Sequence, residues 1–258
     1  MENSSYTQRQ APPQNLLFGI RPLMETLKAG KEVDKVLLKN GLDRELAQEI
    51  EGLLRAQNIL FQYVPIEKLN RLTRKNHQGV VAFASLVAYA DLQEILISVV
   101  EAGKTPLILL LDEVTDVRNF GAIARSAECA GVHAIVVPTK GAAPINGDAM
   151  KTSAGALNLV PVCRVDNLRS AISLLHNNGV QVVAASEKGA TMIYDTDLTL
   201  PTAIVMGAEE SGVSPAVLKV TDALVKIPLQ GSIASLNVSA AASVVLFEAI
   251  RQRLSNEE

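Results

Sequence analysis

Residues 232–248 read Ser-Ile-Ala-Ser-Leu-Asn-Val-Ser-Ala-Ala-Ala-Ser-Val-Val-Leu-Phe-Glu, and the interpretation of the whole chain starts from this stretch. Small and hydroxyl residues fill its first half. The apolar pattern predicts a helix from Leu236 to Arg253 with Ser235 as its N-cap. Just upstream, residues 227–231 have the pattern of a strand that ends in a turn. A loop of small residues before a helix exposes backbone N–H groups that can bind a ligand, but an ordinary capped helix has the same pattern.

Length and composition indicate a globular protein without a structural metal. The chain has 258 residues, 48% of them hydrophobic and 20% charged, which suits a small domain followed by a medium one. Its apolar runs are too short to cross a bilayer, and the N-terminus lacks a secretory signal pattern, so a cytoplasmic location is expected. Cys129 and Cys163 lie in apolar stretches and are expected to be buried free thiols. The three histidines are scattered, so no metal site is predicted.

Charge divides unevenly along the chain. Through Leu86 there are 12 basic against 9 acidic residues, and from Val87 onward 12 basic against 18 acidic residues. A mildly basic front and an acidic rear fit a polyanion-binding part joined to a part that performs chemistry, although chance gives differences of this size.

The pattern predicts a disordered tail over 1–14, a small α/β domain over 15–86, a linker over 87–103 and a larger domain over 104–258. In the front domain, helices are expected at 22–29, 43–57 and 66–73 and strands at 35–38, 59–64 and 79–85. Their alternation predicts a compact three-layer module.

The rear domain is predicted to be a mostly parallel, doubly wound sheet. Near-continuous apolar runs are typical of strands that are covered on both faces, and they occur at 106–111, 134–137, 180–185, 203–206 and 224–227. A further strand is expected at 159–162, and helices at 119–131 and 167–179. Such sheets bind ligands beyond the carboxyl ends of their strands.

The segment 111–127 carries the first candidate site. A strand ends in acidic residues, including Asp112 and Asp116, and a helix follows. Arg118 and Arg125 are seven residues apart and would share one helix face. Arg125 lies among small residues and suits a phosphate clamp, but a surface salt bridge with Asp112 or Asp116 fits equally well.

The segment 203–215 carries the second candidate site. A buried strand enters a loop with two glycines and two glutamates, and Ser214 is placed to cap a helix that has Pro215 at its first position. Gly207 would let the backbone approach a ligand, while Glu209 or Glu210 would bind a ribose hydroxyl or Arg125. A solvated acidic turn is the alternative. Neither the P-loop nor the dinucleotide-binding glycine pattern occurs in the sequence.

Two further segments are weaker signals. Residues 151–156 are small and precede a strand, which suits either a ligand or a close helix crossing. Residues 70–79 gather basic and amide side chains that suit phosphate contacts in structured RNA, although a solvated loop has the same composition. Aromatic content of 3% argues against RNA readers that stack bases on aromatic rings.

The three rear segments, in this order, resemble the signature motifs of the SpoU/TrmH family of RNA ribose 2′-O-methyltransferases in the SPOUT superfamily. The first motif is matched by Asp112, Asp116, Asn119, Gly121, Ile123, Arg125, Ser126 and Ala127, with Val117 where the family usually has proline. The second is matched by 206–209 with Gly212 and Ser214, and the third by 227–229, Gly231 and 235–239. The front module is similar to the family's substrate-binding domain at 19–22 and 77–82. Within the family, the likeness is strongest to bacterial enzymes that methylate a guanosine ribose of 23S ribosomal RNA.

The resemblance implies a parallel sheet with a deep C-terminal trefoil knot, preceded by the small α/β RNA-binding domain, and a homodimer. It implies S-adenosylmethionine (AdoMet) as cofactor, bound by the backbone of Gly207, Ile227 and Leu236 with Met206, Leu229, Thr152 and Ser235 as neighbours. The catalytic set it implies is Arg125, Asn119, Glu209, Ser235 and Asn237. Arg21, Arg71, Arg74, Lys75, Arg118 and Arg125 are the expected RNA contacts, and ribosomal RNA is the expected partner.

Arg125 is the doubtful member of this set as a base, because an ordinary guanidinium stays protonated at neutral pH. A role in binding phosphate and stabilising a developing alkoxide suits it better. Three alternatives to a ribosomal RNA methyltransferase stay open from the sequence: a transfer RNA methyltransferase, a non-catalytic RNA-binding assembly factor with the same fold, and a nucleotide-binding dehydrogenase. The last lacks its glycine fingerprint.

Overall fold

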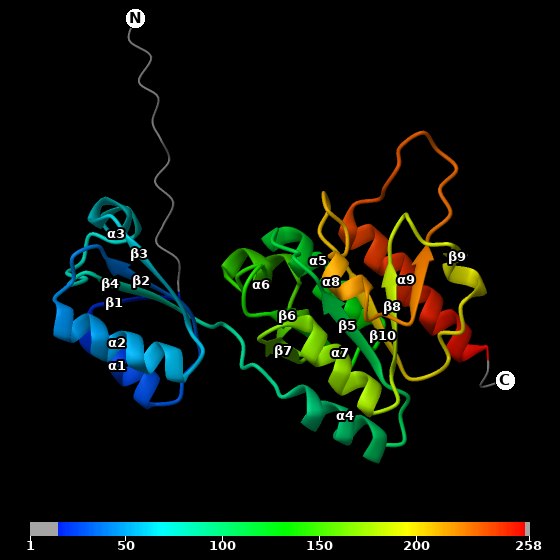
Figure 1. The fold of residues 1–258 in the computed structure, drawn as a ribbon, viewed down its shortest axis with the longest axis horizontal. Helices are drawn as coiled ribbons and strands as arrows, with labels where there is room; N and C mark the ends of the chain where they lie inside the picture. The colour runs from blue at the N-terminus through cyan, green and yellow to red at the C-terminus, as the bar shows by residue number, and fades with distance from the viewer. Residues whose placement is uncertain (1–14, 256–258) are drawn as a thin grey trace, which may run out of the picture. The chain divides into compact units, whose positions relative to one another are not determined.

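The computed structural model describes residues 15–255, which form two compact units that divide after Ser85 (Figure 1). The tail predicted over 1–14 lies outside the described residues. Residues 87–103, predicted as a linker, belong to the second unit. Within them α4 (Leu92–Glu101) buries Leu92 and Leu96, and the Ala90 N–H donates to the Val162 carbonyl.

The first unit is a four-stranded mixed sheet with helices on both faces. Its strand order is β1-β4-β2-β3, from β1 (Leu16–Phe18), β2 (Val33–Lys39), β3 (Leu60–Val64) and β4 (Val80–Ala84). The side chains of α1 (Ile20–Lys28) and α2 (Arg44–Ala56) pack on one face, and those of α3 (Ile66–Leu72) on the other. The module therefore has the predicted three layers, with β1 as an unpredicted edge strand.

The second unit is built on a seven-stranded sheet in which every pairing is parallel. The strand order is β7-β6-β5-β10-β8-β11-β9, from β5 (Leu107–Leu111), β6 (Ala134–Pro138), β7 (Val162–Val165), β8 (Gln181–Ala185), β9 (Thr191–Met192), β10 (Thr202–Met206) and β11 (Ala223–Lys226). Every residue of β5, β6 and β10 is buried, as their unbroken apolar sequences predict.

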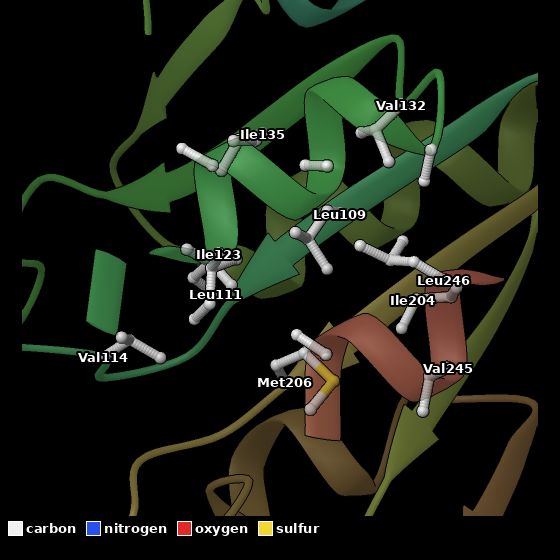
Figure 2. Close-up of a cluster of buried hydrophobic side chains, with 14 of the residues drawn as sticks. Leu109, Leu111, Val114, Ile123, Val132, Ile135, Ile204, Met206, Val245 and Leu246 are labelled. Carbon is white, nitrogen blue, oxygen red and sulfur yellow. The ribbon is translucent and has the colours of Figure 1, made fainter. Parts of the chain in front are cut away.

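Helices cover both faces of this sheet. On one face lie α4, α7 (Leu168–Asn177) and α8 (Pro215–Leu218). On the other lie α5 (Val117–Cys129), α6 (Gly147–Thr152) and α9 (Val238–Leu254). Figure 2 shows how Ile123 of α5 and Val245 and Leu246 of α9 meet the strands between them. This layer packs α9, the last helix of the second unit, against α5, which follows that unit's first strand.

The strand expected at 159–162 is displaced by three residues. A short 3₁₀ turn occupies Ala156–Asn158, Leu159 is 70% exposed, and β7 begins only at Val162. The apolar sequence continues without a break through this region, so it cannot reveal where an edge strand joins its neighbour. Pairing of Val162 with Ile135 of β6 sets that register instead.

The end of α9 is anchored to backbone that precedes two central strands. The Arg253 guanidinium donates to the carbonyls of Leu198, Leu200, Thr105 and Pro106 at 2.9–3.1 Å. Two residues earlier, Arg251 donates to buried Glu248 at 2.8 Å and keeps the pKa of that carboxyl below its ordinary value. The last helix is therefore fixed at its C-terminal turns by hydrogen bonds as well as by apolar packing.

The two cysteines differ, which corrects the expectation that both are buried. Cys163 of β7 is buried, and burial raises the pKa of its thiol to about 12. Cys129, the last residue of α5, is exposed. In the part of the chain that the structure describes, no group of histidine, cysteine and acidic residues could hold a metal ion. None of the helices over residues 15–255 is both long and apolar enough to cross a membrane.

Gly121 fixes how closely α5 and α6 approach each other. A Cβ added at Gly121 would lie 2.8 Å from the Ala149 carbonyl oxygen and 2.8 Å from the Thr152 Cβ. Real Cβ atoms do not come so close to backbone, so only glycine permits this crossing. Residues 151–156 therefore owe part of their small-residue character to helix packing.

We predict opposite effects for the same substitution at two helical glycines. Gly121→Ala should lower the free energy of unfolding of the second unit by about 1–2 kcal/mol, because overpacking outweighs the gain in helix propensity. Gly52→Ala in α2, where an added Cβ meets nothing within 4 Å, should stabilise the first unit by about 0.5–1 kcal/mol. Hydrogen exchange followed by mass spectrometry reports the two units separately. Equal effects at both positions would contradict the packing argument.

Candidate active site

A pocket of about 260 Å³ lies at the carboxyl ends of β8, β10 and β11, where a doubly wound sheet binds ligands. Two connections form its remaining walls: the loop after β10 and the long connection from β11 to α9, drawn in orange in Figure 1. Its lining combines apolar and small residues with two serines and three glutamates: Ala185, Ser186, Glu187, Met206, Gly207, Ala208, Glu209, Glu210, Gly212, Ile227, Leu229, Ala234, Ser235, Leu236, Val238 and Ala241.

The loop after β10 is held in place by Asp112, which is 5% exposed. Its carboxylate accepts the Ser214 N–H at 2.7 Å, and its backbone N–H donates to the Met206 carbonyl at 2.8 Å. A carboxylate that accepts a backbone N–H makes one of the stronger hydrogen bonds in a protein. Asp112 thus orders the pocket wall, and the alternative in which it pairs with Arg125 is wrong. Asp116 likewise caps α5, accepting the N–H groups of Arg118 and Asn119.

Gly207 is required by the loop itself. The loop closes on Gly212 through reciprocal hydrogen bonds between Ala208 and Gly212. A Cβ at Gly207 would lie 2.1 Å from the Gly212 carbonyl carbon, so no other residue fits at this position. Close approach of a ligand is the role that the sequence suggests for Gly207. Close approach of the chain to itself is sufficient, and it leaves the Gly207 backbone at the pocket wall.

The predicted N-cap of the last helix is wrong by two residues. The helix α9 begins at Val238, and Asn237 is its N-cap, with Oδ1 accepting the Ser239 N–H at 2.9 Å. Ser235 instead lines the pocket as part of the exposed connection before the helix. Asparagine and serine are equally good caps, so residue type alone could not choose between them.

Asn237 also joins two other segments. Its Nδ2 group donates to Glu209 Oε1 at 2.5 Å and to Asn119 Oδ1 at 3.1 Å. Seven residues after Asn119 on the same face of α5, the Ser126 hydroxyl meets the Ser243 hydroxyl of α9 at 2.8 Å. One face of α5 is therefore matched to α9 by polar contacts, and the structure brings Asn119, Glu209 and Asn237 into one network.

Arg125 lies outside this network. It is exposed on α5, on the face that also carries Arg118. Within residues 15–255 it has no ion pair or hydrogen bond, so its five N–H donors are available to a ligand. An unpaired guanidinium suits an anion such as a phosphate better than the salt bridge that the sequence left open.

The predicted cofactor neighbours fall into two groups. Six of the seven line the pocket: Met206, Gly207, Ile227, Leu229, Ser235 and Leu236. Thr152 does not, because it packs against Gly121 at the crossing of α5 and α6. The pocket residues Ser186 and Glu187 were missed, since a polar turn after a strand carries no distinguishing signal in a single sequence.

The basic residues predicted in the first unit gather around one turn. Arg71, Arg74 and Lys75 are exposed in and after α3, and Lys75 Nζ lies 5.0 Å from the centroid of the Phe18 ring of β1. The side chain of Gln78 accepts the Ile20 N–H at 3.4 Å, so this loop also lies beside the start of α1, where Arg21 is exposed. The four cations therefore belong to adjoining segments.

Buried His77 gives this basic loop its shape. Its Nδ1 accepts the Gly79 N–H at 3.0 Å, and its Nε2 lies 2.9 Å from Asn70 Oδ1. These two bonds require the neutral ring with its proton on Nε2. A loop fixed in this way presents its cations at lower entropic cost than a mobile one.

Comparison with known proteins matches both units. A model of the SpoU rRNA Methylase family matches residues 106–247, and a model described as RNA 2′-O ribose methyltransferase substrate binding matches residues 16–90. The 23S rRNA (guanosine-2′-O-)-methyltransferase RlmB of Vibrio parahaemolyticus is 42% identical over 245 residues, which cover 93% of this chain and 97% of the relative.

Solved structures of SpoU proteins are also similar to this chain. The SpoU methyltransferase AviRb from Streptomyces viridochromogenes, crystallised in complex with the cofactor AdoMet, is 29% identical with a TM-score of 0.60. The match covers 93% of this chain and 90% of that chain. A TrmH/SpoU tRNA modifying enzyme of A. aeolicus is 33% identical with a TM-score of 0.56, and covers 64% of this chain and 84% of that one.

The double role of Asn237 can be separated by substitution. Asn237→Asp keeps an N-cap acceptor but removes both donated hydrogen bonds and places a second carboxylate beside Glu209. We expect it to lower the free energy of unfolding by about 1 kcal/mol at pH 7. The deficit should shrink as the pH falls toward 4, because protonation of either carboxyl removes the repulsion.

Urea unfolding across this pH range measures the effect. Asn167→Asp is the matched control, since Asn167 caps α7 by accepting the Ser170 N–H and donates to no carboxylate among residues 15–255. If Asn237→Asp lowers the free energy of unfolding by the same amount at pH 4 and pH 7, repulsion between its carboxylate and that of Glu209 is not the cause.

Proposed function

Since this chain belongs to the SpoU rRNA Methylase family and is an RNA 2′-O-methyltransferase that uses AdoMet, we propose that its substrate is a guanosine ribose of 23S ribosomal RNA. One observation carries the proposal. The relative that bears this activity in its name is 42% identical across 93% of this chain and 97% of its own length. The match therefore includes the substrate-binding part as well as the methyltransferase part, and the dehydrogenase alternative is wrong.

The pocket fits the cofactor. Its apolar wall, from Met206, Ile227, Leu229, Leu236 and Val238, suits a purine ring, and its glutamates suit a positively charged ligand. We infer that the backbone of Gly207, Ile227 and Leu236 holds the cofactor, with Met206, Leu229 and Ser235 beside it. When bound, AdoMet supplies a methyl group on a sulfonium, which is already a good electrophile.

The chain's own residues then have to align the ribose 2′-hydroxyl and favour loss of its proton. Alignment alone lowers barriers by roughly 7–11 kcal/mol at the high end. We infer that Asn119, Glu209, Asn237 and Ser235 orient the ribose, since Asn237 already fixes the amide of Asn119 and the carboxylate of Glu209 relative to each other. Arg125 binds the adjacent phosphate and stabilises the developing alkoxide.

RNA contacts are proposed for both units. In the first, Arg21, Arg71, Arg74 and Lys75 surround the ordered loop that follows α3. In the second, Arg118 and Arg125 share one face of α5. Cations clustered on structured backbone suit phosphates of folded RNA, for which binding weakens steeply with salt.

The homodimer and the trefoil knot are further parts of this proposal. The side of α9 that faces away from the core carries Ala240, Val244 and Phe247 at helical spacing, and Phe247 is 49% exposed. This face suits a second copy of the chain. The return of α9 across α5 after the long connection from β11 supports the knot. A cytoplasmic location stays a prediction.

The test of the substrate is a map of 2′-O-methyl sites in total RNA from cells with and without the protein. We expect one guanosine methyl of 23S ribosomal RNA to disappear. Loss of a transfer RNA methyl instead would favour the alternative that the A. aeolicus relative represents. No loss of a methyl from any RNA, together with a ribosome-assembly defect on deletion that an Arg125→Ala form corrects, would favour a non-catalytic assembly factor.

We predict that Arg125→Lys lowers the rate of methyl transfer about 10- to 100-fold, because lysine keeps the charge but cannot bind a phosphate through two parallel donors. Incorporation of labelled methyl groups into RNA measures the rate, and calorimetry should show unchanged AdoMet affinity. Arg169→Lys, at an exposed position of α7, is the control and should be fully active. Near-wild-type methylation by Arg125→Lys with unchanged RNA affinity would refute the clamp.

A further inference from the structure

Glu187 is a pocket carboxylate that the proposed reaction does not use. It belongs to the turn that follows β8 and lines the pocket together with Ser186. Its side chain is exposed, and among residues 15–255 it makes one contact, a 3.4 Å approach of the Ser186 hydroxyl. A contact of that length is weak, so the carboxylate keeps most of its acceptor capacity.

The turn that carries Glu187 is built to hold one position. The Ser186 N–H donates to the Val225 carbonyl of β11 at 2.8 Å, and the Gly189 N–H closes the turn on the Ser186 carbonyl at 3.0 Å. The Ser186 hydroxyl accepts the Lys188 N–H. Gly189 is buried so tightly that an added Cβ would lie 2.5 Å from the Val225 carbonyl carbon. Glu187 is thus presented at the pocket from a fixed backbone without stabilising that backbone itself.

The sheet order places Glu187 on the side of the pocket away from the reaction network. In the sequence β5-β10-β8-β11, Asn119 and Arg125 follow β5, Glu209 follows β10, and Glu187 follows β8. Neighbouring strands are about 4.8 Å apart, so the end of β8 is about two strand spacings from the end of β5. The apolar wall formed by Ile227 and Leu229 follows β11, on the other side of β8.

The chemistry of AdoMet indicates which of its groups lies near Glu187. The methyl group must face the network near α5, and the purine ring needs the apolar wall next to β11. The ribose connects these two parts of AdoMet, and its two neighbouring hydroxyls are the donors between them. A carboxylate can accept both, as an acidic residue does at the ribose in dinucleotide-binding folds.

We propose that Glu187 is a cofactor-binding residue whose carboxylate accepts hydrogen bonds from the ribose hydroxyls of AdoMet. This inference rests on the use of AdoMet by the family and not on which RNA is methylated. It assigns recognition of the adenosyl part to the turn after β8, separately from the residues that act on the RNA.

Calorimetric titration of the full-length protein tests the proposal with three probes: AdoMet, S-adenosylhomocysteine and 5′-methylthioadenosine. All three carry the ribose hydroxyls, but methylthioadenosine lacks the amino-acid part. Glu187→Ala should weaken the binding of each probe by about tenfold, and Glu187→Gln by less, because an amide oxygen still accepts but carries no charge. Glu101→Gln, an exposed position at the end of α4, is the control and should bind all three as the wild type does.

The outcomes are distinct. Weakened binding of AdoMet and S-adenosylhomocysteine with unchanged binding of methylthioadenosine would overturn the proposal and assign Glu187 to the cofactor's ammonium group. Unchanged binding of all three to Glu187→Ala would remove Glu187 from the site. Failure of the wild type to bind AdoMet would instead refute the cofactor assignment itself. Thermal unfolding of each variant without ligand checks that the exposed substitution leaves the fold intact.

Discussion

The arrangement of the site depends on one side chain, that of Asn237. Its oxygen starts the last helix, and its amide nitrogen binds Glu209 from the loop after β10 and Asn119 from α5. These three segments are separated by up to 118 residues in the chain. A primary amide can join them because it is an acceptor and a donor at opposite atoms. A serine at the same place would cap the helix equally well but would leave the carboxylate and the second amide without a shared partner.

The sequence predicts the strands of the second unit well and the polar contacts of the site poorly, for a physical reason. Strands such as β5 and β10 are buried on both faces, so their composition alone reveals them. Composition cannot reveal the role of Asp112, because its partner Ser214 is 102 residues away and contributes only a backbone N–H. Thr152 lies at the crossing of α5 and α6 and outside the pocket lining, and its sequence could not indicate this because small residues suit a helix crossing as well as a ligand.

Some motif residues stabilise the structure of the site, and others have polar groups that are available to a ligand. Asp112, Asp116, Gly121 and Gly207 are explained by hydrogen bonds and close packing within the chain. Arg125 is exposed and makes no hydrogen bond or ion pair among residues 15–255, whereas Asn119 and Glu209 each use one oxygen on Asn237 and keep their other polar atoms for a ligand. Resemblance to a family finds both kinds of residue without separating them. The structure separates them, because a group whose bonding capacity is used inside the protein is not available to a substrate.

Arg253 has a consequence for how this protein is made. It lies at the end of α9 and binds the carbonyls that precede β5 and β10, while the same helix has Asn237 as its N-cap and supplies part of the pocket wall. During synthesis the earlier strands can leave the ribosome and pair, but the pocket has no closing wall until the final helix has followed them. A chain that has not yet formed α9 therefore has the first unit, with the exposed cations Arg21, Arg71, Arg74 and Lys75, but no completed pocket for the chemistry.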